Sequence, residues 1–223
     1  MIYLPVSLFI FLLFLLLILP LLWVAITLDI VQFAAGKLGF SPSVAFGLLI
    51  LSLLGSAINL PLYQVETEIH LVPDLLSVYE RFFWRLPLRQ VQQVTIVALN
   101  VGGGLIPVLL ALYQFTQTPA VAILLVTAIV TTVSYYSAHI VPGIGIQMSP
   151  LVAPVTAALS AFVILPAQAS SVAFAGGILG TVMGADLLHL KDLEQMSAGV
   201  LSIGGAGVFD GIALCGLMAL LLT

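Results

Sequence analysis

The sequence predicts an all-α fold: a polytopic transmembrane helix bundle of six or seven spans with one interfacial amphipathic helix, forming a single transmembrane domain over residues 1–223. Three observations lead to this class: 62% of the residues are hydrophobic, 6% are charged, and the mean hydropathy is +1.28. A soluble domain carries roughly 25% charged residues and is about half apolar. So few charged groups cannot cover a water-exposed surface, and lipid is therefore the expected solvent.

The expected spans are the apolar stretches that approach the roughly 20 residues needed to cross a bilayer. Unpaired backbone groups are costly in hydrocarbon, and the stretches lack the period-two alternation of a barrel, which leaves helices. The stretches are 5–28, 42–62, 94–115, 119–138, 149–166, 170–186 and 203–222. The fifth and sixth are short, with Pro150, Pro154 and Pro166 near their boundaries. They pair as a tight hairpin, or one of them is re-entrant, so the count stays at six or seven.

The distribution of Lys and Arg predicts the orientation, because cytoplasmic loops carry an excess of these residues. With a cytoplasmic N-terminus, the inner loops hold Arg81, Arg85, Arg89 and Lys191, and the outer loops hold only Lys37. The opposite orientation inverts this ratio. We therefore expect a cytoplasmic N-terminus and, with seven spans, a C-terminus on the outer side.

The one long connection, 63–93, is predicted to be an amphipathic insertion on the cytoplasmic side. Polar and apolar residues alternate from Gln64 to Leu71, which indicates a short strand. From Asp74 to Leu86 the period becomes helical, with an aromatic face and a basic face, as in helices that lie in the membrane interface. The lipid-interface residues of this segment are Arg81, Trp84, Arg85 and Arg89. A structural lid or a docking surface is the alternative interpretation.

Two carboxyl groups form the predicted catalytic pair, Asp186 and Asp210. An Asp at the centre of a spanning helix costs roughly 2.5 to 3.5 kcal/mol, so it needs an explanation. Asp210 lies about seven residues into the last stretch, roughly 10 Å below the inner boundary at the helical rise. Asp186 ends the sixth stretch, on the same side of the membrane. Two carboxyl groups that share a site titrate apart, and one then serves as general base and the other as general acid.

Other polar side chains are expected at the same level of the membrane and form a supporting cluster. They are Asn59, Asn100, His139 and His189. Simpler interpretations stay open: Asp210 is buried neutral or caps a broken turn, and Asp186 is solvated at a helix end. The glycines at 204, 205 and 207 would then serve to let neighbouring helices approach closely.

Several other classes of function are disfavoured. The net charge of −4 is spread over short loops with no basic run, so a nucleic-acid partner is not expected. His139, Asp186, His189 and Asp210 supply ligand types for zinc or iron, but they form no compact motif, and we expect no metal. No phosphate-binding loop or nucleophile elbow is present, and no cofactor is predicted. Cys215, the only cysteine, is expected to be a small packing residue.

Five motifs together resemble a prokaryotic multi-pass membrane family known as domain of unknown function 1614. They are Asn-Leu-Pro-Leu-Tyr at 59–63, Asn-Val-Gly-Gly-Gly-Leu-Ile-Pro at 100–107, Val-Pro-Gly-Ile-Gly at 141–145, Gly-Ala-Asp-Leu-Leu at 184–188 and Ser-Ile-Gly-Gly-Ala-Gly-Val-Phe-Asp-Gly-Ile at 202–212. The resemblance implies a place in a prokaryotic cell membrane, or an internal membrane such as the thylakoid. It implies no established activity.

A looser similarity links the chain to presenilin-like and prepilin-peptidase-like intramembrane aspartyl proteases. Asp186 and Asp210 match the order and direction of the two catalytic aspartates that this resemblance implies. The motif departs from the family, because Phe209 stands where those proteases carry the second Gly of Gly-x-Gly-Asp.

Three functions remain open from the sequence. The first is a membrane-embedded aspartyl hydrolase or protease that uses the paired carboxylates. The second is a transporter or channel for a small solute or a proton, and the third is a non-catalytic membrane assembly factor. The predicted partners are membrane lipid and a membrane-protein substrate or partner.

Overall fold

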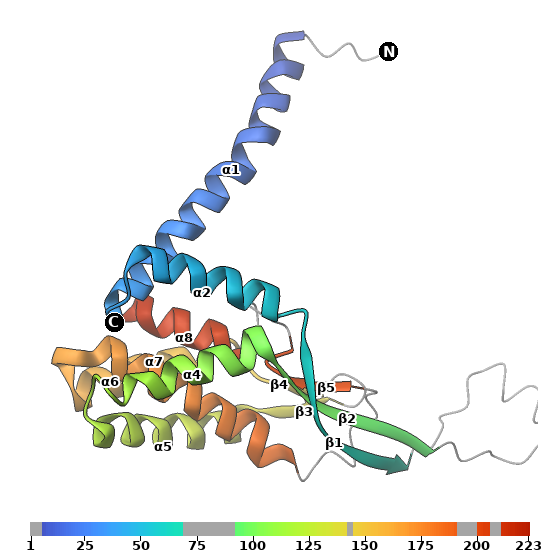
Figure 1. Cartoon of the computed structure of the whole chain (residues 1–223), viewed down its shortest axis with the longest axis vertical. Helices are drawn as coiled ribbons and strands as arrows, with labels where there is room; N and C mark the ends of the chain where they lie inside the picture. The colour runs from blue at the N-terminus through green and yellow to red at the C-terminus, as the bar shows by residue number, and fades with distance from the viewer. Residues whose placement is uncertain (1–5, 69–91, 142–144, 191–199, 206–210) are drawn as a thin grey trace, which may run out of the picture. The chain divides into compact units, whose positions relative to one another are not determined.

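A computed structural model describes residues 6–68, 92–141, 145–190, 200–205 and 211–223 (Figure 1). Within these ranges helix is the dominant secondary structure. The α-helices are α1 (Val6–Lys37), α2 (Pro42–Gly55), α4 (Ile106–Gln114), α5 (Ala120–Ser137), α6 (Val152–Ile164), α7 (Ala169–Thr181) and α8 (Gly211–Leu222). The strands are β1 (Asn59–Glu68), β2 (Gln92–Asn100), β3 (His139–Val141), β4 (Gly145–Gln147) and β5 (Val200–Ile203).

The chain divides into two compact units, Met1–Ile50 and Leu51–Thr223. The first unit contains α1 and the beginning of α2. Gly39 ends the turn after α1 with a φ of +82°, a conformation that glycine adopts without strain. The second unit contains the end of α2, all the strands and α4 to α8. The single transmembrane domain expected over 1–223 stays a prediction.

Among the residues that the structure describes, three helical segments are long and apolar enough to cross a bilayer: Ile18–Lys37, Ala120–Ser137 and Pro166–Leu190. The second unit also places small residues inside and large apolar residues outside. Ala157, Ala161 and Cys215 are fully buried, whereas Leu159 and Val163 of α6 are 63% and 84% exposed. Such an arrangement suits a lipid solvent, in which close helix packing depends on small residues. The chain is therefore a membrane protein, and its number of spans stays a prediction.

Helix α7 forms the centre of the second unit, and glycines on its surface set its spacing to its neighbours. A Cβ atom on Gly176 or Gly180 would lie 2.6 Å from side-chain atoms of Val126 or Val130 in α5. On another face, a Cβ atom on Gly177 would lie 3.0 Å from Cys215 Sγ in α8. Backbones therefore approach closely along α7, as small residues at four-residue spacing allow.

The sheet of the second unit corrects the all-α prediction. Its strand order is β1-β2-β5, with β1 antiparallel to β2 and β2 parallel to β5. The stretches predicted as helix over 42–62, 94–115 and 203–222 are strand at 59–62, 94–100 and 203, so that prediction was wrong there. The β-branched segment at 94–97 favours strand, and cross-strand pairing satisfies the backbone groups that a spanning helix would otherwise pair internally.

Other expectations for these segments had mixed outcomes. Each of the seven predicted stretches overlaps one of the α-helices, but α1 continues beyond residue 28 to Lys37, so its predicted end was wrong. The strand predicted from Gln64 to Leu71 is confirmed as far as Glu68, and it begins earlier, at Asn59. The amphipathic helix predicted over 74–86 lies outside the described residues, together with Arg81, Trp84, Arg85 and Arg89.

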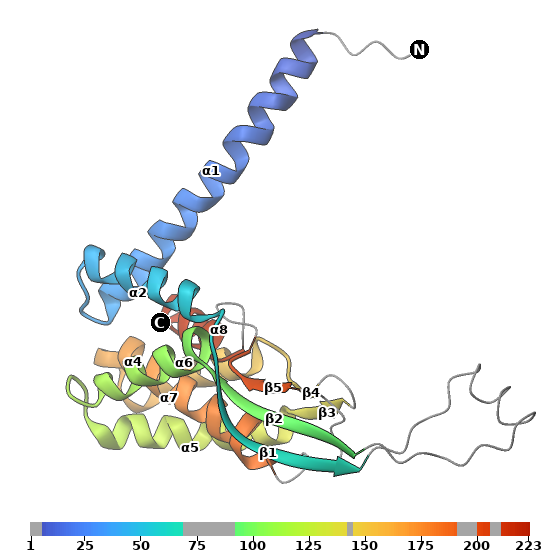
Figure 2. The same ribbon diagram turned by 45° about the vertical axis from the view of Figure 1, so that its right-hand side comes forward.

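The strands gather at one end of the bundle that α4 to α8 form, hereafter the strand end (Figures 1 and 2). Helices α4 and α6 begin there, after β2 and β4. Helix α5 returns to the same end and is followed by β3. The strand end is therefore where irregular backbone and polar side chains accumulate.

Candidate functional site

Two of the predicted polar residues, Asn59 and Asn100, meet at the strand end and are joined by Ser202. Ser202 Oγ donates to Asn59 Oδ1 at 2.6 Å, and Asn100 Nδ2 donates to the same oxygen at 3.1 Å. Asn100 is fully buried; its Nδ2 also donates to the Ser56 carbonyl at 2.7 Å, and its Oδ1 accepts from Gly103 N at 2.8 Å. We name Asn59, Asn100 and Ser202 the asparagine junction. It satisfies the buried polar groups at the point where strand becomes helix.

The glycines after Asn100 let this segment pass close to two other backbone segments beside the asparagine junction, the end of α2 and the residue that follows β5. Val101–Leu105 form a π-helical turn that leads into α4. A Cβ atom on Gly102 would collide with the Ser52 carbonyl oxygen of α2, whose own Oγ donates to the Gly102 carbonyl at 2.6 Å. On the other side, a Cβ atom on Gly204, whose φ is +73°, would lie 2.6 Å from the Gly103 carbonyl carbon. The segment that leads to Asp210 therefore starts from a fixed backbone position.

Asp186 lies in a second group of residues at the strand end. It closes the π-helical turn Val182–Asp186, which follows α7, and it is partly buried. Turns of this kind occur frequently at functional sites. His189 is buried, its Nδ1 donates to the Gly184 carbonyl at 3.1 Å, and its ring stacks on Tyr135 with centroids 4.8 Å apart. Contacts from α5 thus hold the segment that carries Asp186.

Two residues of α5, Thr131 and Ser134, pack against this turn. A Cβ atom on Gly184 would collide with the Thr131 carbonyl oxygen and lie 2.9 Å from Ser134 Cβ. The hydroxyls of Thr131 and Ser134 are buried and have no hydrogen-bond partner among the described residues. An unpaired buried hydroxyl costs free energy, so these groups are available to a water molecule or a polar ligand.

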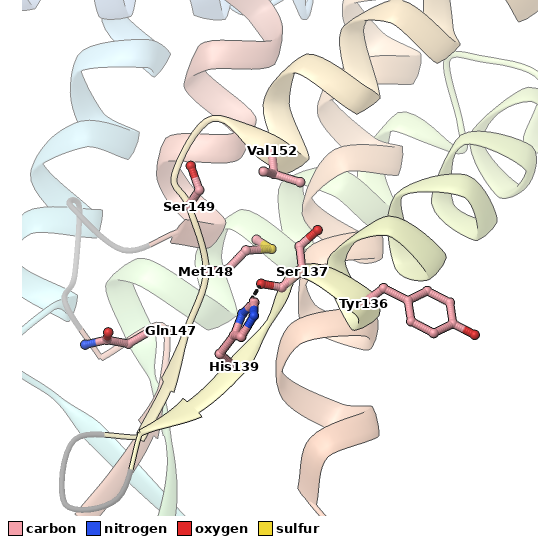
Figure 3. Close-up of a pocket in the computed structure, with 7 residues that line it drawn as sticks. All are labelled: Tyr136, Ser137, His139, Gln147, Met148, Ser149 and Val152. Carbon is pink, nitrogen blue, oxygen red and sulfur yellow. Dashed lines mark hydrogen bonds between the residues drawn. The ribbon is translucent and has the colours of Figure 1, made fainter.

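His139 belongs to a third location, an open pocket of about 620 Å³ at the connection between α5 and α6 (Figure 3). The side chain is exposed, and its Nδ1 donates to the Ser137 carbonyl at 2.7 Å. The predicted supporting residues are thus distributed over three groups. Over the part of the chain that the structure describes, no three His, Cys, Asp or Glu residues lie close enough to hold a metal ion.

Asp210 lies outside the described residues, but the residue that follows it is placed. Gly211, the next residue, begins α8, which packs against α7. A Cβ atom on Gly216 would lie 2.8 Å from Ile178 Cδ1 and 2.9 Å from Phe174 Cε2 of α7. Helix α7 ends at the strand end and α8 follows β5 from that end, so the two helices are antiparallel neighbours.

Sequence reasoning missed Ser202, Tyr135 and Ser134. Ser202 meets Asn59 across 143 residues of chain, and no local pattern predicts such a contact. The four-residue glycine spacing at 176, 180 and 184 was a usable signal. It would have predicted the close contact of α7 with a neighbouring helix, although not which helix.

Comparison with known proteins identifies the family. No curated protein and no solved structure shows a significant match. The similarity to intramembrane aspartyl proteases therefore stays a prediction. A family model described as "Protein of unknown function (DUF1614)" matches residues 53–222, from the end of α2 to the last residue of α8. This match includes the whole sheet, the helix bundle and all three groups of polar residues. The chain therefore belongs to the DUF1614 family, as its motifs predicted.

Proposed function

We propose that this protein is a multi-pass membrane hydrolase in which Asp186 and Asp210 act as paired carboxylates on a membrane-borne substrate. The observation that carries the proposal is the antiparallel packing of α7 and α8. Asp186 follows α7 at the strand end, and Asp210 is bonded to Gly211, the residue that begins α8 at that end.

The helical register of α7 and α8 supports a short separation between Asp186 and Asp210 along the bundle axis. Gly177 and Cys215 lie at the same level, because a Cβ atom on Gly177 would be 3.0 Å from Cys215 Sγ. Towards the strand end, Asp186 lies nine residues beyond Gly177, or roughly 13 Å, and Gly211 lies four residues beyond Cys215, or roughly 6 Å. The difference of about 7 Å is one that two aspartate side chains and one peptide unit can span.

The chemistry requires the two carboxyl groups to differ in protonation. Two carboxyl groups a few ångströms apart do not both ionise, so one carboxyl keeps a proton while the other stays charged. The ionised group then takes a proton from a water molecule that attacks the substrate carbonyl, and the protonated group gives its proton to the leaving group. Thr131 and Ser134 pack against the turn that ends at Asp186, and their buried hydroxyls are suited to hold a water molecule.

A transporter is the second candidate, and one observation favours it. The chain changes from strand to helix at Gly102–Gly104 and from strand to turn at Gly204. These two segments cross each other closely at the strand end. Irregular backbone at membrane depth lines the sites for ions and solutes in transporters. Flux of protons or small solutes through liposomes that hold the purified chain would favour this function, and tight vesicles would count against it.

The hydrolase is tested in cells that produce the wild-type chain, Asp186→Asn, Asp210→Asn or the control Asp29→Asn, a change in α1. Terminal peptides of membrane proteins are quantified by mass spectrometry at equal abundance of each variant. General acid–base groups contribute about 10²- to 10⁴-fold to a rate, so cleavage of the substrate should fall at least about a hundredfold in both active-site variants. Equal processing by the wild type and both variants would exclude the hydrolase. Loss of a partner protein without loss of cleavage would favour an assembly factor.

A further inference from the structure

The pocket between α5 and α6 carries a second inference, because most of the residues that line it have hydrogen-bonding side chains and none of them is Lys, Arg, Asp or Glu (Figure 3). Five side chains with hydrogen-bonding groups line it: Tyr136, Ser137, His139, Gln147 and Ser149. Met148 and Val152 add an apolar part. We propose that this pocket, hereafter the hairpin pocket, binds the uncharged sugar headgroup of a membrane glycolipid.

The position of the hairpin pocket favours a lipid as the source of the ligand. Helix α5 has 18 residues, or roughly 27 Å of length, close to the hydrocarbon thickness of about 30 Å. Its last turn carries Tyr135 and Tyr136, which are 41% and 78% exposed. Exposed tyrosines at the end of an apolar helix are typical of the membrane–water interface. The pocket begins directly after this turn and therefore lies at the level of the headgroups.

The chemistry of the lining favours hydroxyl groups over phosphate. Sites for anionic headgroups use Lys or Arg, and neither lines the hairpin pocket. The Ser and Tyr hydroxyls and the Gln147 amide both donate and accept hydrogen bonds, as the hydroxyls of a sugar do. The Ser137 carbonyl can only accept, so His139 Nδ1 carries a proton, and Nε2 is the ring nitrogen that remains for a ligand.

The hairpin of β3 and β4 places two of the lining residues on neighbouring strands. His139 is paired with Gln147 in the antiparallel register, so the two side chains leave the same face of the hairpin. Met148 and Val152 follow on the side of α6 and offer apolar surface to a sugar face or to the glyceride. The proposal stands independently of Asp186 and Asp210, which do not line the pocket.

The test uses the full chain in phosphatidylcholine nanodiscs that contain a photoactivatable glucosyl diacylglycerol. After illumination, the labelled peptides are mapped by mass spectrometry. We expect the label on residues 136–152. Gln147→Leu and His139→Phe should each reduce labelling about two- to tenfold, the effect of one lost hydrogen bond. Gln117→Leu is the matched control, because Gln117 is an exposed glutamine of the α4–α5 connection, and it should label like the wild type.

Three results would overturn the proposal. The first is equal labelling of this segment by a photoactivatable phosphatidylglycerol, whose headgroup carries a phosphate charge. The second is unchanged labelling in both pocket variants, each of which is checked for the wild-type elution volume. The third is full competition by methyl glucoside at the concentration of the lipid, which would make a soluble sugar the ligand.

Discussion

Asn100 has no exposed surface and uses both atoms of its amide, so a single side chain holds the end of β2, the end of α2 and the following turn together. The sequence could single out Asn100, because an amide in an apolar run is costly unless it is paired. The sequence could not show its partners. Ser56 and Asn59 are brought to it by the pairing of β1 with β2, and Ser202 joins them only through β5.

We predict that Asn100→Ala lowers the free energy of unfolding by about 2 to 4 kcal/mol. The change removes three hydrogen bonds, each worth about 0.5 to 1.5 kcal/mol, and leaves buried groups unpaired. Denaturant titration in mild detergent measures the effect. Gln117→Ala, at an exposed amide, should stay within about 0.5 kcal/mol of the wild type. A similarly small effect for Asn100→Ala would contradict the role of the asparagine junction.

Gln114, like Asn100, is a buried amide, but its hydrogen bonding differs. It is fully buried at the end of α4, and neither of its amide atoms has a hydrogen-bond partner in the part of the chain that the structure describes. We predict that Gln114→Met, which keeps the length of the side chain, leaves the free energy of unfolding unchanged or raises it by about 1 to 3 kcal/mol. The same titration checks this result. A loss of more than about 1 kcal/mol would show that the amide is satisfied in the folded protein.

At the scale of elements, the apolar runs predicted where helices occur but not where they end. The stretch 94–115 reads as one apolar run, yet β2 occupies its first seven residues and α4 only its last part. Hydropathy does not distinguish a buried strand from a buried helix, because both exclude water. What decides between them is whether a neighbouring strand is available, and β1 and β5 come from distant parts of the chain.

The packing of α7 on α5 gives a prediction at this scale. A Cβ atom on Gly180 would lie 2.6 Å from Val130 Cβ and 3.0 Å from the Thr127 carbonyl oxygen, so Gly180→Ala must push the helices apart. Overpacking of this kind costs about 1 to 3 kcal/mol of stability. Gly36→Ala in α1 is the control, because a Cβ atom there meets nothing within 4 Å. Thermal unfolding of both variants should show a loss for Gly180→Ala alone, and an unchanged midpoint would contradict the close contact of α5 and α7.

At the scale of the whole molecule, the composition was enough to predict a lipid environment. The positions of the polar residues relative to one another could be found only from the structure. The sequence predicted that polar residues gather near one end of the spans. The structure places Asn59, Asn100, Asp186, His139 and His189 at the strand end, in three separate groups. The separation arises because the groups belong to different parts of the chain: Asn59 and Asn100 lie between α2 and α4, His139 follows α5, and Asp186 and His189 follow α7. Which helices are neighbours depends on packing that a hydropathy pattern does not encode.

The pairing of Asp186 with Asp210 is the central claim, and cysteine cross-linking tests it most directly. In a Cys215→Ala background, which removes the only native cysteine, the double variant Asp186→Cys/Asp210→Cys is treated with a short bifunctional thiol reagent in membranes. Asn59→Cys/Ser202→Cys serves as the positive control, because Ser202 Oγ and Asn59 Oδ1 are 2.6 Å apart. We predict that both pairs cross-link at similar rates. Cross-linking of the control pair without cross-linking of residues 186 and 210 would contradict a shared carboxylate site.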